Sequence, residues 1–342
     1  MAAILYSAQD LAWALDAALA RCLDGAVPAE LRAPTPAAVA AVDAASCALQ
    51  HSHSQHVEDI LLLPTLLNAA GWGRPGVFVE LGALDGVRYS NTLLLERCFN
   101  WTGVLIEASP RNFAGLQRGN RHARLLHSAV CRGVGTVMMT VANKQGSQEA
   151  GEVGQIDNNY LRRLRKKGLL TNRTIEVPCK SLDDLMADSG ITRADFLSLD
   201  VQGAEEKVLE ATHPSHFKVI MVEADKSTSV KQRARVTERI VSSGLRRAAN
   251  GVAVPGSATF VQPDIIPVRV RSEAKLGQAG FHIHRCALKA YHGDPRFQSI
   301  GLNHSAASMW HRGARMTIPG PKEWHRPAPP CGYICPSERA QA

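Results

Sequence analysis

Long apolar runs are missing from this chain of 342 residues. No segment approaches the ~18 consecutive apolar residues of a membrane-spanning helix, so the sequence offers no transmembrane span. Residues 1–25 lack the basic start of a secretory signal peptide and contain Asp10 and Asp16, a pattern that favours an amphipathic helix. With 45% hydrophobic and 20% charged residues, the composition is that of a soluble globular protein.

Closely spaced cysteines are also missing. The eight cysteines are scattered, and the only near neighbours, Cys331 and Cys335, have a spacing that fits no familiar zinc or redox motif. We therefore expect reduced thiols and a cytoplasmic location. Three glycosylation sequons, which begin at Asn100, Asn172 and Asn303, point instead toward a secretory or organelle lumen.

Acidic residues are scarce toward the C-terminus. Residues 231–342 hold 17 Lys and Arg against 6 Asp and Glu, a net charge of +11, whereas the whole chain carries +8. Such a segment could bind a nucleic acid, the anionic surface of a membrane or an anionic substrate, although a solvated basic tail is the commoner outcome. The basic stretch 161–168 leaves the same choice open, between an anion-binding helix and a solvated helix face.

From residue 77 onward, short apolar runs alternate with helical segments. The pattern predicts strands at 77–81, 103–108, 123–130, 136–142, 174–178, 195–200 and 218–224, a hairpin ending at 258–262, and helices at 91–99, 110–119, 181–190, 204–212 and 230–244. This alternation predicts an α/β fold with a mostly parallel sheet covered by helices on both faces. We expect three regions: an Ala-rich peripheral extension (1–53), the main domain (54–265) and a basic, His/Pro-rich, partly irregular extension (266–342).

In open α/β sheets, ligands bind outside the carboxyl ends of the strands. The first strand runs into a turn that is rich in small and acidic residues, namely Glu80, Gly82, Ala83, Asp85 and Gly86. Small residues let the backbone approach a ligand closely. The G-x-G-x-x-G pattern is missing, so a dinucleotide pyrophosphate would be poorly held.

An acidic residue closes the second predicted strand. Glu107 lies 25 residues after Gly82, close to the ~20-residue spacing of a ribose-binding acid in this architecture. Taken singly, Glu80 could merely cap its turn and Glu107 could stand exposed at a helix start. Together, without a phosphate cradle, they favour an adenosine ligand that carries no phosphate, and S-adenosylmethionine is the obvious candidate.

Two segments resemble a known family. "VFVELGALDGVRYSNTLLLERCFNWTGVLIEASPRNFAGL" (77–116) and "LDVQGAEEKVL" (199–209) are similar to the FkbM-type S-adenosylmethionine-dependent methyltransferases, and more narrowly to the eukaryotic branch related to the animal Star protein. The resemblance extends over residues 54–262. It implies a class I methyltransferase fold, Rossmann-like and doubly wound, with N- and C-terminal extensions, and O-methylation of a hydroxyl on a small molecule or carbohydrate.

The resemblance assigns roles to individual residues. It implies cofactor contacts for Glu80, Gly82, Ala83, Gly86 and Glu107, a position near the adenine for Ser128, and a family signature formed by Asp200, Gly203 and Glu205. The signature usually has glutamate where this chain has Gln202, and an amide cannot act as a base.

A hydroxyl acceptor needs a base, and the sequence leaves the choice open. Asp200 and Glu205 are the candidates, but Glu205 could instead complement the dipole at the start of its helix. Glu223, after the next strand, is a second candidate for the acceptor pocket. The Gln202 departure also allows a non-catalytic, Star-like interaction or trafficking module that retains the fold.

Two further site types have little support. Methylation of a nucleobase amine has no support in the sequence, because no Asn/Asp-Pro-Pro-aromatic tetrad is present. His51, His53 and His56 have no partner ligands at known spacing, so we expect no metal site.

Overall fold

The computed structural model describes residues 6–24, 37, 41–142, 158–224, 229–248 and 256–270. Most of the expected C-terminal extension, with Cys331, Cys335 and the Asn303 sequon, lies outside these residues. Within them, no helix has the combination of length and hydrophobicity that a transmembrane span requires.

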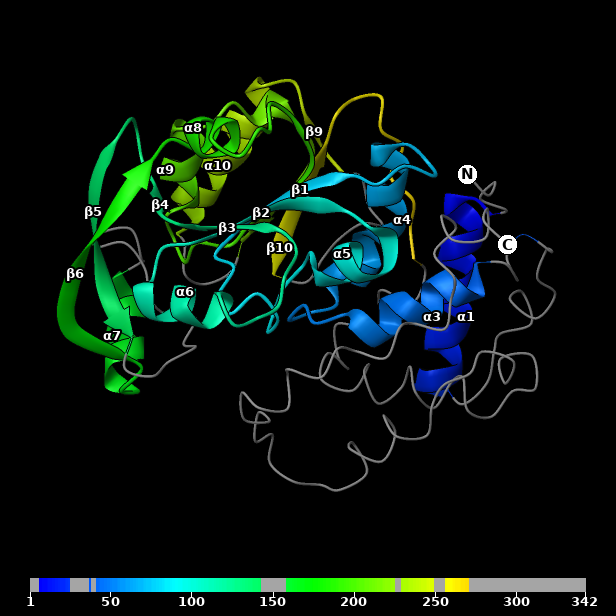
Figure 1. Ribbon diagram of the computed structural model, residues 1–342, viewed down its shortest axis with the longest axis horizontal. Helices are drawn as coiled ribbons and strands as arrows, with labels where there is room; N and C mark the ends of the chain where they lie inside the picture. Colours follow the sequence, from blue (N-terminus) through cyan, green and yellow to red (C-terminus); the bar gives the residue numbers. More distant parts are fainter. Residues whose placement is uncertain are drawn as a thin grey trace, which may run out of the picture.

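A seven-stranded sheet forms the centre of the molecule (Figure 1), with the strand order β3-β2-β1-β7-β8-β10-β9. Its strands are β1 (Val77–Leu81), β2 (Thr102–Glu107), β3 (Arg124–His127), β7 (Ala194–Leu199), β8 (Phe217–Glu223), β9 (Arg246–Arg247) and β10 (Ser257–Val261). β10 runs antiparallel to β8 and β9, and the other pairs are parallel. The order reverses between β1 and β7, so the crevice of a doubly wound sheet opens there.

Helices cover both faces of the sheet, as the alternation of strands and helices predicts. Side chains alternate along each strand, so Phe78 of β1 packs on one side, while Val79 packs on the other. The Phe78 side is covered by α4 (Glu58–Ala70) and α5 (Leu93–Phe99), and the Val79 side by α8 (Leu182–Ala187), α9 (Glu205–Glu210) and α10 (Val230–Ser242). The expected fold class is confirmed.

The N-terminal helices belong to the same core as the sheet. Helices α1 (Ala8–Asp24) and α3 (Val42–His51) contribute the buried Leu11, Leu15 and Leu49 to the cluster that contains Phe78. The expectation of a peripheral N-terminal extension is therefore wrong for these helices. Their small alanine side chains permit close helix packing, which composition alone did not distinguish from a linker.

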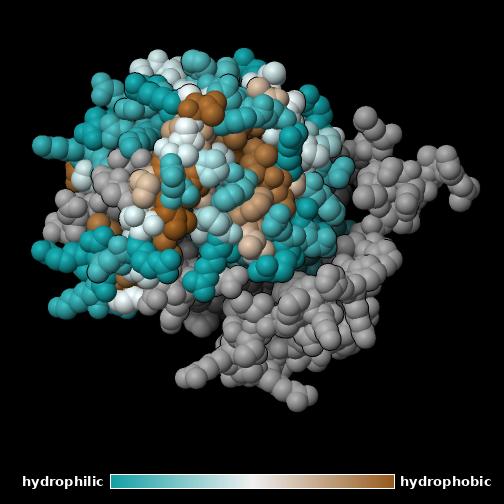
Figure 2. All heavy atoms as spheres, turned by 60° about the vertical axis from the view of Figure 1, so that its left-hand side comes forward, coloured by the Kyte–Doolittle hydropathy of each residue, from teal (hydrophilic) through white to brown (hydrophobic). Residues whose placement is uncertain are grey.

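The expected third strand is divided between two sheets. β3 ends at His127, and after Ser128 the chain enters a second sheet with the order β4-β6-β5. This sheet consists of β4 (Ala129–Val130), β5 (Gly135–Ala142) and β6 (Leu170–Lys180). It stands at one end of the molecule, beside α6 (Pro110–Leu116) and α7 (Asn158–Lys166) (Figure 1). The surface seen from this end is mostly hydrophilic, with apolar residues gathered in its middle (Figure 2).

Two disulfides overturn the expectation of reduced thiols. Cys47 of α3 pairs with Cys98 of α5, and Cys131 pairs with Cys179 of β6. The pairs are 51 and 48 residues apart in sequence, so spacing rules for neighbouring cysteines did not find them. One disulfide ties the N-terminal helices to the sheet domain, and the other fixes the second sheet internally.

We predict that the double variant Cys47→Ser, Cys98→Ser is destabilised by about 2–4 kcal/mol, because the crosslink restricts the unfolded chain. The free energy of unfolding should be measured by urea denaturation without reductant. Adding reductant to the unsubstituted protein should produce a loss at least as large, since it opens both disulfides. Equal stability of the variant and the unsubstituted protein would contradict the crosslink.

Candidate functional site

A pocket opens at the carboxyl ends of β1, β2 and β7, where the strand order reverses. Its walls combine apolar side chains, among them Ile106, Val130, Val137, Met139 and Val208, with polar groups at the strand ends. Its acidic lining residues are Glu80, Glu107 and Asp200, and none of the described lining residues is Lys or Arg. The pocket therefore favours an uncharged or cationic ligand and disfavours a phosphate.

Gly82 forms the tightest part of the pocket floor. Its φ of +78° lies in the left-handed region, and a Cβ at this position would stand 1.8 Å from the backbone oxygen of Asp200. The exits of β1 and β7 thus touch through a glycine, and the nitrogen of Asp200 also donates to the oxygen of Leu81 at 3.3 Å. Any larger residue would push the two strand ends apart.

Glu107 holds the turn after β1 in place. Its two carboxylate oxygens accept from the backbone nitrogens of Leu84 and Ser109, both at 2.8 Å. Leu84 has a φ of +53°, which is unusual for a residue with a side chain. Burial raises the pKa of Glu107 to about 7, against the effect of these hydrogen bonds. The side chain of Asn112 also hydrogen-bonds this carboxylate, so one of its about four lone-pair sites is left to accept from a ligand hydroxyl.

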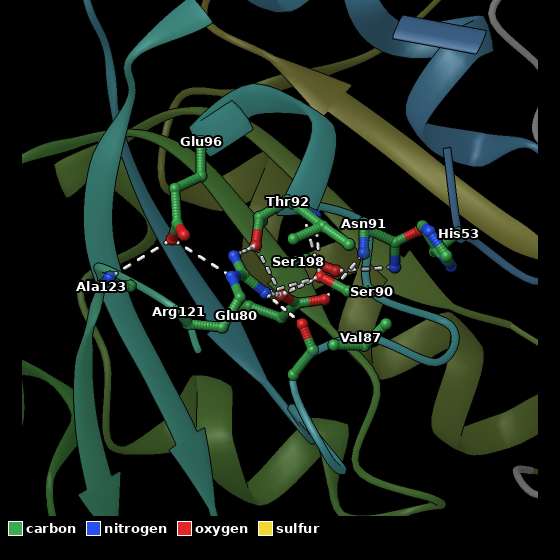
Figure 3. A network of polar contacts seen from close by, with 12 residues as sticks. His53, Glu80, Val87, Ser90, Asn91, Thr92, Glu96, Arg121, Ala123 and Ser198 are labelled. Carbon is green, nitrogen blue, oxygen red and sulfur yellow. Dashed lines mark hydrogen bonds and ion pairs between the residues drawn. The ribbon is translucent and has the colours of Figure 1, made fainter. Parts of the chain in front are cut away.

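Glu80 lies at the centre of a buried polar network (Figure 3). It accepts from the hydroxyl of Ser90 at 2.9 Å and from the backbone nitrogen of Asn91 at 2.8 Å, and Arg121 approaches it at 3.9 Å. Burial raises the pKa of Glu80, and Arg121 opposes that rise. Glu80 thus shapes the pocket wall, because its hydrogen bonds hold the loop that follows β1.

Asn91 adds an unused acceptor to this wall. Its amide nitrogen donates to the hydroxyl of Ser198 at 3.0 Å, which turns the side chain toward β7. Its Oδ1 is buried and has no hydrogen-bond partner in the structure, although Asn91 lines the pocket. Because a buried acceptor without a partner costs free energy, a ligand donor at this position would be stabilising.

The segment after β7 forms a second polar cluster at the pocket. Gln202, with a φ of +54°, donates from its Nε2 to Asp200 Oδ1 at 2.9 Å and to Glu223 Oε2 at 3.1 Å. Glu223 stands at the end of β8, so the amide bridges the carboxylates of two neighbouring strands. A glutamate at this position would place a third carboxylate between them and could not donate these bonds when ionised.

Glu205, the first residue of α9, holds the turn that precedes its helix. Its Oε1 accepts from the backbone nitrogens of Val201 at 3.2 Å and Gly203 at 3.0 Å, and its side chain does not line the pocket. Burial raises its pKa to about 7. These contacts give Glu205 a supporting role at the start of α9, away from the pocket lining.

The other predicted residues divide between the pocket and its support. Ser128 lines the pocket, and its hydroxyl donates to the oxygen of Ala129 at 2.7 Å. Asp85 accepts from the backbone of the same turn, while Ala83 and Gly86 pack beneath it, and none of these three lines the pocket.

The sequence analysis missed Glu58 at the start of α4. Its carboxylate accepts from the nitrogen of His56 at 2.6 Å, and its pKa rises to about 7, mainly through burial and in part through the charge of Asp200. The neighbouring Asp59 binds Ser52 and Ser54, so the histidine-rich loop folds around acids. The sequence signal that could have indicated these contacts is the pair Ser52 and Ser54 shortly before Glu58 and Asp59. Within the described residues, His51 lies in a group with Cys47 and Cys98 whose possible ligand atoms are within 4.8 Å of one another, and a disulfide joins these two cysteines.

Comparison with known proteins identifies the domain that holds this pocket. Residues 80–241 match the sequence profile of the methyltransferase FkbM domain. This part of the chain is therefore similar to the FkbM methyltransferase domain. The match includes the end of β1 and the whole of β2 and β7, together with Glu107, Asp200 and Gln202.

Two solved structures are similar to the chain at low identity. One is a methyltransferase FkbM from Methylobacillus flagellatus, at 13% identity and a TM-score of 0.33, where the match covers 64% of this chain and 57% of that protein. The other is an O-methyltransferase from Bacillus cereus in complex with SAH, at 16% identity and a TM-score of 0.31, covering 66% of this chain and 89% of that one. The chain therefore spans little more than half the length of the Methylobacillus protein. No curated protein sequence matches the chain.

We predict that the stability of this protein falls as the pH rises from about 4.5 to about 7. Glu205 has an ordinary pKa of 4.5 and a folded-state pKa of about 7, so in this window the folded state keeps a proton that the unfolded state has released. The stabilisation is complete below the unfolded pKa and is lost as the pH passes the folded pKa. Glu58, Asp59 and Glu107 shift in the same direction.

The variant Glu205→Gln isolates one contribution. It keeps an acceptor for the two backbone nitrogens and cannot ionise, so it should flatten the pH dependence by up to about 3 kcal/mol. Urea denaturation at pH 5 and pH 8 measures the change. A variant with an unaltered slope between these pH values would show that Glu205 ionises normally in the fold.

Proposed function

We propose that the FkbM domain binds S-adenosylmethionine in this pocket and methylates a hydroxyl of a small molecule or carbohydrate. The observation that carries the proposal is the pocket lining, which has three carboxylic acids and no described basic side chain. A sulfonium cofactor carries positive charge and no phosphate, so it suits this lining where a dinucleotide does not.

The residues present fit such a cofactor at three points. Gly82, which lines the pocket, lets the exits of β1 and β7 meet there, because a Cβ would collide with the Asp200 backbone. Glu107 offers its remaining acceptor site to a ribose hydroxyl. The orphaned Oδ1 of Asn91 offers an acceptor to a donor such as an ammonium.

The cofactor, when bound, supplies an electrophilic methyl group. The chain supplies alignment of the acceptor and removal of its proton. Asp200 is the base in this proposal, because it lines the pocket at the exit of β7, whereas Glu205 binds the turn before its own helix. Gln202 orients Asp200 through Oδ1 and ties it to Glu223. The amide in place of the family's glutamate thus removes a charge and supplies the donor of both hydrogen bonds.

We predict that Gly82→Ala weakens the binding of S-adenosylhomocysteine by more than about 100-fold, or about 2.7 kcal/mol, because the new Cβ collides with the Asp200 backbone. Isothermal titration calorimetry measures the dissociation constant. Gly133→Ala is the matched control: Gly133 has a φ of +76°, but nothing lies within 4 Å of its added Cβ. Failure of the unsubstituted protein to bind at millimolar ligand would refute the cofactor proposal.

We predict that Asp200→Asn lowers kcat for hydroxyl methylation by about 10²–10⁴-fold, the usual contribution of a general base. Its affinity for S-adenosylhomocysteine should change little, since the amide keeps the shape of the carboxylate. The measurement is S-adenosylhomocysteine release on a panel of sugars and small alcohols.

A different result would favour a non-catalytic role. Intact cofactor binding without turnover on any acceptor, in both the unsubstituted protein and Gln202→Glu, would point to a Star-like interaction or trafficking module. The observation behind this alternative is the amide at position 202 where the family signature has an acid.

A further inference from the structure

Both disulfides link elements that are distant in the chain. Cys47 and Cys98 have Cα atoms 5.8 Å apart, and Cys131 and Cys179 have Cα atoms 5.6 Å apart, separations that are typical of native disulfides. The first crosslink joins α3 to α5, and the second joins the turn after β4 to β6. Disulfides of this structural kind persist in oxidising compartments and are rare in the cytosol.

The sequons in the described part of the chain present their acceptors to solvent. Asn100, at the end of α5, and Asn172, in β6, are both exposed, and so are the hydroxyl residues of their sequons, Thr102 and Thr174. Between Asn100 and Thr102, Trp101 is 2% exposed. The acceptor of this sequon therefore faces outward from an anchored backbone, and a glycan there would not disturb the core.

The two observations support the same environment independently. Disulfide pairing requires an oxidant, and N-linked glycosylation requires a lumenal transferase. Both of these sequons also lie close to a disulfide cysteine in sequence, since Asn100 follows Cys98 by two residues and Asn172 precedes Cys179 by seven. Neither observation depends on methyl transfer.

We propose that this protein is made in an oxidising, glycosylating compartment, where Asn100 and Asn172 accept N-linked glycans and the two disulfides form. In glycosylation, the side-chain nitrogen of asparagine bonds to the anomeric carbon of a lipid-diphosphate-linked oligosaccharide. The nitrogen loses one proton, and the lipid diphosphate leaves. In each disulfide, two thiols lose two protons and two electrons to a disulfide-bearing oxidase of that compartment, which is reduced to its dithiol.

The first test uses the native protein, immunopurified from its source cells in the presence of N-ethylmaleimide. Peptide N-glycosidase should increase its electrophoretic mobility, and mass spectrometry without reductant should find Cys47, Cys98, Cys131 and Cys179 unmodified by maleimide. An unchanged mobility, or maleimide on these four cysteines, would overturn the proposal, whatever the outcome of any cofactor-binding experiment.

The second test assigns the acceptors. The full chain carrying Asn303→Gln is secreted from eukaryotic cells behind a cleavable leader. It should carry two glycans, each of the variants Asn100→Gln and Asn172→Gln one, and their combination none. A chain secreted without glycans would exclude both asparagines as acceptors.

Matched hydroxyl variants separate loss of the acceptor motif from loss of folding. Thr102→Ala and Thr174→Ala should each remove one glycan with both asparagines in place, whereas Thr102→Ser and Thr174→Ser should retain it. A glycan that persists on the alanine variants would contradict assignment to these sequons.

Discussion

The pocket depends on a charge pair that is buried beneath it. Arg121 is fully enclosed, and its guanidinium contacts Glu96 at 3.1 Å, the oxygen of Gly86 at 2.6 Å and the hydroxyl of Ser90 at 3.0 Å. Buried charges are stabilising only when nearly every donor and acceptor is satisfied, as here. The loop after β1 is thereby held against Glu80, and the pocket is shaped before a ligand arrives.

The buried glutamates of this site differ in their partners. Glu80 lies near Arg121, which opposes the rise of its pKa, whereas Glu58, Glu107 and Glu205 have no basic partner among the described residues, and their pKa values rise to about 7. These acids surround Asp200, whose charge contributes to all three shifts. Binding of an anion would therefore be unfavourable at this site, whereas binding of a cation would be favourable.

Local sequence patterns predicted most of the central sheet. The runs 77–81 and 218–224 match β1 and β8 within one residue, because strand periodicity and apolar content are local properties. The run 123–130 was not one strand, because the division at Ser128 depends on which strands are available as partners. The sequence also placed Gly82 and Glu107 at one site, since the carboxyl ends of neighbouring parallel strands meet at one edge.

The sequence by itself determined the fold class, the glycine turn and the acid that follows it, since each rests on short-range periodicity or on a fixed spacing. Only the tertiary structure decided the contacts between distant segments. It brought Glu58 toward Asp200, made Gln202 a bridge to Glu223, and paired the cysteines. The physical reason is that such contacts form only when packing of the whole core closes long loops, and no local pattern encodes the partner.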